Sequence, residues 1–355
     1  MSTIGIGIMI SHLRTKILSL FLFLLLFLSG LPLQAQLDEP SFCLISPTRS
    51  TEIIQEGIQV IRGEQNPGAD TSMRLVELVT WYQQHPFIDY ASLIETSITV
   101  KFIDGSYVVL MNPLCEKQRY IGDGLSPSLH VRYIGGTNKT AVILNPSESM
   151  YGHYQCQRII TTLLNHDYSI EYLANQAVDL PFIKNNLSAA IIYMNTHAGY
   201  FDVGGDHQAD AVVIATGEFW TNETEQKYAF DYQNKLIVKG MVGDQGVIAF
   251  TPALIEQYYA PEEFPDSLVF MATCYALYDT SMAEKFLDAG ASVYMGWSQD
   301  TVFWTNSKTS VSAFRLLSYG LTVQQVCRII RYGGFYNWLF HSKLIYYGDG
   351  GHQIP

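Results

Sequence analysis

The fold of this chain is constrained most by two apolar runs, each of which is followed directly by a chemically reactive side chain. Leu268–Thr273 is followed directly by Cys274, and Ala190–Thr196 is followed directly by His197. Short apolar runs bounded by small or polar residues are typical of buried β-strands. Because active sites of open α/β sheets collect beyond the carboxyl ends of the strands, we expect both side chains at one edge of a sheet.

The segments around these two runs predict an α/β fold. Further strands are predicted at Thr140–Leu144, Tyr168–Leu173 and Ser292–Trp297. Helices are predicted at Tyr154–Leu164, Met282–Ala289, Phe303–Tyr319 and Val323–Tyr332, with a short helix or loop at Phe182–Leu187. Strands that alternate with helices favour a three-layer sandwich with a mainly parallel sheet.

Composition and charge exclude one class of partner. Hydrophobic residues make up 48% of the 355 residues and charged residues 15%, which is typical of a globular protein. The net charge is −12, and the sequence has no basic run. Since phosphate contacts need clustered Lys and Arg, we expect no nucleic-acid partner.

The first 35 residues have the pattern of a signal peptide. Arg14 and Lys16 precede the apolar run Ile17–Leu28, and Ala35 offers a small residue for cleavage. The run is short for a transmembrane helix, so an uncleaved membrane anchor is the less favoured alternative. We therefore expect a secreted or periplasmic mature chain with no membrane partner once residues 1–35 are removed.

Residues 36–130 are predicted to form a small α+β region before the main domain at 131–355. Within it Gln36–Asn66 is weakly patterned, Thr71–Gln84 has helical spacing, and Thr96–Met111 has two alternating runs around an Asp-Gly turn. The region is interpreted as a pro-segment, a substrate-side domain or an extension of the main sheet.

A long insertion, Tyr200–Asp266, separates the two reactive side chains. We expect extra strands or loops over the top of the sheet, where substrate sites are usually built. Asp202, Asp206 and Asp210 lie among glycines there, which leaves calcium as an alternative, since Ca²⁺ takes several oxygen ligands. The spacing completes no calcium-loop signature, so a solvated loop is favoured and no cofactor is expected.

The cysteines do not have metal-ligand spacing. The five are Cys43, Cys115, Cys156, Cys274 and Cys327. An odd count in an exported protein leaves at least one free thiol or an intermolecular bond. If Cys274 is the free thiol, the other four form zero, one or two disulfides.

Cys274 and His197 together suggest nucleophilic catalysis. A thiol attacks a carbonyl as the thiolate, and a histidine within hydrogen-bonding reach serves as its base. Small neighbours such as Ala198, Gly199 and Ala272 let a carbonyl approach backbone N–H groups, which form an oxyanion hole. The alternatives are a buried structural cysteine and a hydrogen-bonded loop histidine.

The segments IIYMNTHAG, LVFMATC and EKFLDAGASVYMGWS resemble the caspase–haemoglobinase fold, with the gingipain-like cysteine peptidases closest and clostripain and legumain more distant. The resemblance covers roughly residues 138–355. It implies that His197 is the general base and acid and that Cys274 is the nucleophile. The backbone N–H groups of Cys274 and of Ala198 or Gly199 would form the oxyanion hole. The expected activity is that of an exported cysteine endopeptidase acting through a thioester on a protein or peptide substrate.

The sequence departs from the family pattern in three respects. Ala198 stands where the family usually has glycine, and Ala272 stands where clostripain-like enzymes carry an acidic residue for a basic P1 side chain. Specificity for Arg or Lys is therefore not expected, and no clear third catalytic residue is found. Trp297, Ser298 and Asp300 are predicted to line the specificity pocket.

Two other functions stay open at this stage. One is a catalytically inactive member of the fold that serves as a binding or surface-assembly module. The other is a hydrolase or transpeptidase that uses the same pair on a non-protein amide.

Overall fold

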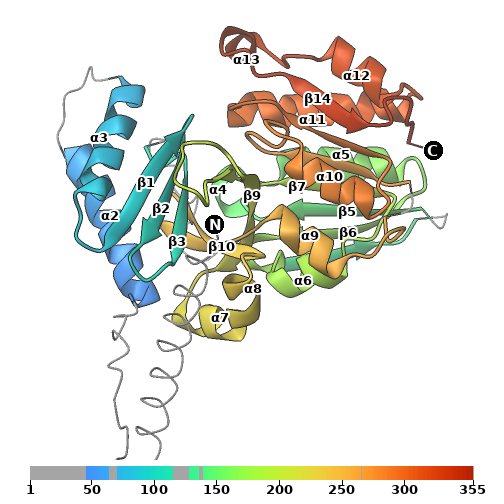
Figure 1. The fold of residues 1–355 in the computed structure, drawn as a ribbon. Helices are drawn as coiled ribbons and strands as arrows, with labels where there is room; N and C mark the ends of the chain where they lie inside the picture. Colours follow the sequence, from blue (N-terminus) through green and yellow to red (C-terminus); the bar gives the residue numbers. More distant parts are fainter. Residues whose placement is uncertain (1–44, 64–69, 115–127, 136–138, 265, 355) are drawn as a thin grey trace, which may run out of the picture. The chain divides into compact units, whose positions relative to one another are not determined.

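The computed structural model describes residues 45–63, 70–114, 128–135, 139–264 and 266–354. The predicted signal peptide, Cys43 and Cys115 lie outside these residues. Leu44–Pro355 forms one compact unit built on two seven-stranded sheets (Figure 1). None of the helices in the described ranges is long and apolar enough to cross a membrane.

One sheet is mainly parallel, as predicted. Its strand order is β14-β13-β12-β7-β5-β6-β4. The strands are β4 (Leu129–Tyr133), β5 (Thr140–Asn145), β6 (Ser169–Ala174), β7 (Ile191–Asn195), β12 (Leu268–Ala272), β13 (Val293–Trp297) and β14 (Leu344–Gly348). Neighbouring strands from β13 to β6 run parallel, whereas β14 and β4 close the two edges in the antiparallel sense.

Helices cover both faces of this parallel-rich sheet, which is compatible with the predicted α/β sandwich. One face packs against α5 (Tyr154–Leu164), α11 (Phe303–Ser318) and α12 (Val323–Ile329). The other packs against α6 (Leu180–Asn185), α9 (Pro252–Tyr258) and α10 (Ser281–Asp288). Successive residues of β12 alternate between the two cores, with Phe270 in the first and Met271 in the second. Both faces of the strand are thus buried, which explains its unbroken apolar run.

The other sheet is mainly antiparallel, with the order β1-β2-β3-β10-β11-β9-β8. Its strands are β1 (Ile88–Ile94), β2 (Ser97–Phe102), β3 (Tyr107–Met111), β8 (Ala198–Phe201), β9 (Ala211–Phe219), β10 (Ile237–Val242) and β11 (Gln245–Phe250). Only the β3–β10 pairing is parallel among the pairs recorded for these described strands. The insertion was predicted to form extra strands or loops over the first sheet. Its strands instead join those of the N-terminal region in a second sheet.

Two N-terminal helices pack on the antiparallel-rich sheet. They are α2 (Pro47–Gly63), which the sequence analysis did not predict, and α3 (Thr71–Gln83), which it did. Their apolar residues share a core with β1, β2 and β3. Shorter helical segments are α4 (Glu148–Tyr151), η1 (Asn175–Ala177), α7 (Asn222–Lys227), α8 (Ala229–Gln233) and α13 (Phe335–Leu339).

Candidate active site

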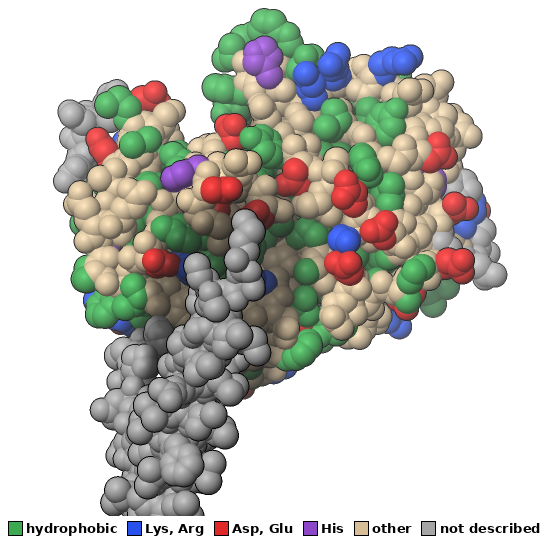
Figure 2. Space-filling view, viewed as in Figure 1, with side chains coloured by type: hydrophobic (Ala, Val, Ile, Leu, Met, Phe, Trp, Pro, Cys, Tyr) green, Lys and Arg blue, Asp and Glu red, His purple; other side chains and the backbone are tan. Residues whose placement is uncertain are grey.

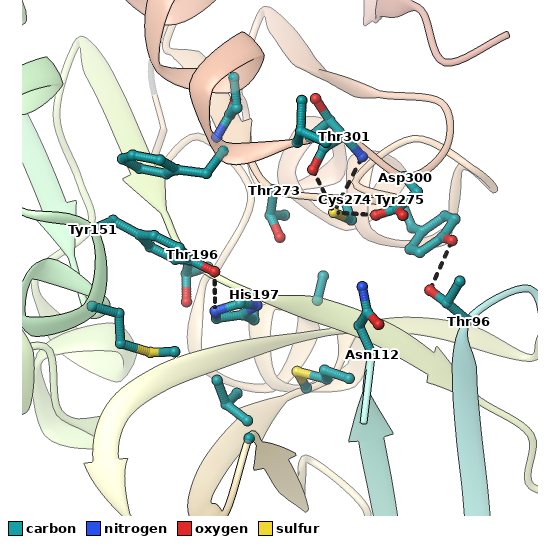
Figure 3. Close-up of a pocket in the computed structure, with 18 of the residues that line it drawn as sticks. Thr96, Asn112, Tyr151, Thr196, His197, Thr273, Cys274, Tyr275, Asp300 and Thr301 are labelled. Atoms are coloured by element: carbon teal, nitrogen blue, oxygen red, sulfur yellow. Dashed lines mark hydrogen bonds between the residues drawn. The ribbon is translucent and has the colours of Figure 1, made fainter. Parts of the chain in front are cut away.

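The two reactive side chains follow adjacent parallel strands. Ala272, the last residue of β12, pairs with Asn195, the last residue of β7. Cys274 and His197 each lie two residues farther on, so the register carries both beyond the same edge of the sheet. They line one cavity of about 610 Å³ (Figure 3). The register thus places both residues at one edge of the parallel-rich sheet.

The thiol of Cys274 is hydrogen-bonded to the loop that follows β13. Cys274 Sγ lies 2.9 Å from Asp300 Oδ1, to which it donates, and it accepts from the Thr301 N–H at 3.4 Å. Burial raises the pKa of the Asp300 carboxyl group above its usual range, although the bond to Cys274 opposes this shift. An S–H donor bonded to a carboxylate is favoured over a thiolate beside the same negative charge. We therefore expect Asp300 to favour the protonated thiol in the resting protein.

His197 is half-buried, and its ring is held by an aromatic pair. Burial lowers the pKa of His197 from 6.5 to about 4, so the imidazole is neutral at neutral pH. A hydrogen bond of 3.0 Å joins His197 Nε2 and Tyr151 Oη. The Tyr151 ring in turn stacks on Phe303, with ring centroids 4.3 Å apart. A neutral, oriented imidazole is suited to accept a proton.

Strand register distinguishes the two predicted oxyanion donors on β8. The His197 carbonyl accepts from the Ala215 N–H in the β8–β9 ladder. Since N–H directions alternate along a strand, the Gly199 N–H also faces β9. The Ala198 N–H faces the other edge, as does the Tyr200 N–H, which donates to Ser97 Oγ. Ala198 also lines the cavity, so it is the better candidate of the two.

The loop that carries Cys274 is held in a specific shape. Tyr275 adopts φ = 61°, a left-handed conformation that is uncommon for a non-glycine residue. The Tyr275 N–H donates to the Gln299 carbonyl and the Leu277 N–H to the Trp297 carbonyl. A Cβ on Gly296 of β13 would lie 2.5 Å from the Ala276 Cβ, so only glycine allows this close approach.

An asparagine beneath the cavity ties the strand ends together. Asn306 Nδ2 donates to the Ala272 carbonyl at 2.8 Å, and Asn306 Oδ1 accepts from Trp297 Nε1 at 2.9 Å. Trp297 is fully buried in the core of the parallel-rich sheet. The prediction that Trp297 lines the specificity pocket is therefore corrected: its side chain points into the core because alternate residues of β13 do.

The two other predicted specificity residues have different positions. Ser298 lies outside the cavity lining, and its Oγ accepts from the Lys343 N–H next to β14. It thus supports the strand pair and not the pocket. Asp300 does line the cavity, where it contacts the nucleophile candidate itself.

The remaining cavity lining comes from helices and from the antiparallel-rich sheet. The helices α4, α11 and α13 contribute the aromatic side chains of Tyr151, Phe303, Trp304 and Tyr336. The antiparallel-rich sheet contributes the ends of β3 and β10, and Thr96 Oγ1 lies 3.0 Å from Tyr275 Oη. At the rim, an ion pair of 3.1 Å joins Arg62 of α2 and Asp244 of the β10–β11 turn.

The three aspartates considered as calcium ligands accept hydrogen bonds from backbone N–H groups of their own loop. Asp202 is fully buried and accepts from the N–H groups of Gly205 and His207. Asp206 accepts from the Gln208 N–H, and Asp210 from the Val203 N–H. Within the described ranges, no group of three or more His, Cys, Asp or Glu side chains has a metal-binding arrangement.

The accessible thiol among the described cysteines is that of Cys274. Cys156 and Cys327 are free but buried. Burial raises the pKa of the Cys156 thiol, and it raises the pKa of the Cys327 thiol to about 12. Both are therefore inert thiols at neutral pH, whereas Cys274 opens to the cavity.

Sequence reasoning did not find Tyr151 or Asn306. Tyr151 lies in the short helix α4 after β5, and a tyrosine there carries no catalytic pattern. Asn306 lies near the start of α11 and is almost fully buried. The signal that could have identified Asn306 was a polar residue on the buried face of the predicted helix Phe303–Tyr319.

Comparison with protein-family models gives no match, and comparison with curated proteins gives no similar sequence. The resemblance to a peptidase family therefore rests on the sequence segments that carry it.

Proposed function

We propose that the protein is an exported cysteine peptidase of caspase-like fold in which Cys274 and His197 act as a pair. One observation carries this proposal: β7 and β12 are adjacent and parallel, and their carboxyl ends bring a neutral histidine and the accessible cysteine to one cavity. A cavity beyond the carboxyl ends of parallel strands is where active sites of open α/β sheets usually lie.

The proposed reaction has two steps. The Cys274 proton passes to the His197 imidazole as sulfur attacks the substrate carbonyl, and the oxyanion is held by the N–H groups of Ala198 and Cys274. The imidazolium then gives its proton to the departing amine, leaving a thioester on sulfur. Water, deprotonated by His197, cleaves the thioester and releases the acid, which regenerates the thiol.

The lining of the cavity suits the binding of an apolar or aromatic side chain of the substrate. Its wall is rich in aromatic rings, and its rim charges, Arg62 and Asp244, already pair with each other. Asp300 is bonded to the thiol, so it offers no free carboxylate to a cationic side chain in the resting state.

The inactive binding module remains the second candidate. The bond from Cys274 to Asp300 favours it, because a thiol held by a carboxylate is a weaker nucleophile. For catalysis, substrate binding must break this bond and turn the thiol toward His197.

Cleavage of reduced casein tests the proposal. The wild-type chain starting at Gln36 should cleave casein, and Cys274→Ala should abolish cleavage while it keeps the wild-type circular dichroism spectrum. Since general-base catalysis contributes roughly 10²–10⁴-fold, His197→Asn should lower kcat/KM by that factor. The matched control is Cys327→Ala, which removes a buried thiol and should keep full activity. Cleavage that survives Cys274→Ala would refute the assignment.

A further inference from the structure

The C-terminal part of the chain carries an unusual charge distribution. The whole sequence has a net charge of −12, yet residues 301–348 include no Asp or Glu. Their cations are Lys308, Arg315, Arg328, Arg331 and Lys343. This stretch builds α11, α12, α13 and β14. A locally cationic surface on an acidic protein needs an explanation of its own.

These cations lack acidic partners within the described residues. All ion pairs of the described ranges lie outside residues 301–348. Arg331 lies over the ring of Tyr332, and Arg315 over that of Tyr319. By contrast, Arg62, Lys184 and Lys285 each pair with a carboxylate. The positive charge of the C-terminal stretch is therefore available to an external anion.

Large apolar side chains are exposed next to these cations. In and just after α13, Phe335 is 74% exposed, Trp338 53%, Leu339 52% and Phe340 51%. Soluble proteins seldom leave so many large apolar side chains together in water without a binding role.

One open groove brings the two kinds of side chain together. Its volume is about 570 Å³, and Lys308, Arg328 and Arg331 line it with Phe335 and Trp338. In Figure 2, hydrophobic and Lys or Arg side chains lie side by side along the top of the view, over α12 and α13 of Figure 1. We call this surface the α12–α13 patch, defined by those five residues together with Leu339 and Phe340.

We propose that the α12–α13 patch docks the protein onto an anionic lipid surface. Trp, Phe and Leu side chains favour the boundary between lipid headgroups and acyl chains, and flanking Lys and Arg meet the lipid phosphates. Charge complementarity selects this occupant, since an anionic membrane offers apolar depth and phosphate together. The proposal departs from the expectation of no membrane partner, and it does not depend on the proposed peptidase activity.

Vesicle co-sedimentation tests the proposal without any activity measurement. The chain starting at Gln36 keeps every described residue and removes the apolar run Ile17–Leu28, which would bind lipid by itself. It should bind vesicles containing phosphatidylglycerol at least tenfold more tightly than vesicles of phosphatidylcholine alone, and added salt should weaken this binding.

Two variants remove the two components of the patch separately. Arg328→Glu with Arg331→Glu should weaken binding to phosphatidylglycerol vesicles by tenfold or more, because each cation contributes roughly fivefold near an anionic surface. Phe335→Ala with Trp338→Ala should weaken it similarly. All four positions are exposed, so folding should persist. The controls Lys235→Glu and Phe230→Ala change an exposed cation and an exposed aromatic ring outside the patch, and both should bind as wild type does.

Four results would overturn the proposal. They are absence of any vesicle binding, equal binding to both kinds of vesicle, wild-type binding by both patch variants, and full displacement by inorganic phosphate at an ionic strength at which the protein stays bound in sodium chloride. The first would leave the patch to a protein partner, and the last would identify a site for a soluble anion.

Discussion

We expect Asp300 to lower the reactivity of Cys274 in the resting protein. The Asp300 carboxylate accepts the hydrogen bond from the Cys274 thiol, and burial raises the pKa of Asp300. A negative charge is therefore unfavourable on either group. A substrate that displaces Asp300 from the thiol would therefore activate the nucleophile as it binds. The contact joins two residues that sequence reasoning had assigned to different roles.

Asp300→Asn should accelerate alkylation of Cys274 by iodoacetamide at neutral pH, by roughly tenfold, because the amide removes the negative charge that opposes a thiolate. Peptide mass mapping over time measures the rate at each cysteine. Asp288→Asn, at an exposed carboxylate, is the control and should leave the rate unchanged. An unchanged or slower rate in Asp300→Asn would show that Asp300 does not restrain the thiol.

The lowered pKa of His197 makes folding stability depend on pH. The folded state binds this proton only below about pH 4, whereas the unfolded chain binds it below 6.5. Stability from this residue is therefore complete above 6.5 and is lost as the pH falls from 6.5 toward 4. Between about pH 7 and about pH 5 the loss should be about 2 kcal/mol in the free energy of unfolding.

Urea denaturation at the two pH values measures this loss. His197→Asn has no titrating group at the position, so the difference in pH dependence between wild type and variant isolates the histidine. Identical pH dependence in both proteins would contradict the lowered pKa of His197.

At the residue scale, the sequence indicated correctly only the positions of side chains that directly follow buried strands. Cys274 and His197 follow apolar runs whose pairing could be anticipated. Trp297 could not be placed correctly, because which face of a strand meets a cavity depends on the layers around it. Ser298 was misplaced for a related reason: its partner Lys343 comes from β14, 45 residues away along the chain.

At the element scale, the close packing of β13 against the Cys274 loop determines where the thiol lies. Gly296 leaves room for Ala276, and Tyr275 accepts a left-handed backbone to make the turn. Such a conformation costs on the order of 1–3 kcal/mol and persists where the surroundings over-determine it. The geometry of the loop is thus part of the site.

Gly296→Ala should displace this loop. The added methyl overlaps the Ala276 Cβ, so we expect a loss of about 1–3 kcal/mol in the free energy of unfolding and a changed alkylation rate at Cys274. Gly246→Ala in β11 is the matched control, since its nearest neighbours lie at 3.5 Å and leave room for a methyl group. A Gly296→Ala protein with wild-type stability and Cys274 reactivity would contradict this role for the loop.

The helix α2 shows where element prediction fell short. Its buried residues Ile53, Ile54, Ile58 and Ile61 have helical spacing, so a signal was present within the segment judged weakly patterned. The five parallel strands β5, β6, β7, β12 and β13 were anticipated because they are buried on both faces, which produces continuous apolar runs, whereas the edge strands β4 and β14 were not predicted.

At the scale of the whole molecule, the two sheets build the cavity together. The pairing of β3 with β10 joins residues more than a hundred positions apart, and no local pattern predicts such a partner. The division at residue 130 stays a prediction, but β1–β3 share a sheet with strands of the insertion. Residues 45–114 therefore support the site through packing as well as through Arg62 and Thr96.

A truncated chain that begins at residue 128 tests this dependence. Without β1–β3, the edge of β10 and the apolar residues Phe201, Val213 and Val238, which pack with β3, lose their cover, so the product should be insoluble or aggregated on size-exclusion chromatography. Removal of residues 1–35 alone keeps both sheets and should give a soluble monomer. A soluble truncated monomer with wild-type reactivity at Cys274 would show that the N-terminal region is an independent accessory segment.

The pairing of Cys274 with His197 is the central claim, and one measurement tests it most directly. The rate of iodoacetamide modification at Cys274 is compared between Asp300→Asn, in which the carboxylate no longer opposes a thiolate, and the double variant Asp300→Asn with His197→Asn at neutral pH, with buried Cys156 and Cys327 as internal references. If His197 accepts the thiol proton, Cys274 in Asp300→Asn reacts fastest of the three and slows on the order of tenfold in the double variant. Equal rates at Cys274 in the two proteins would contradict the account.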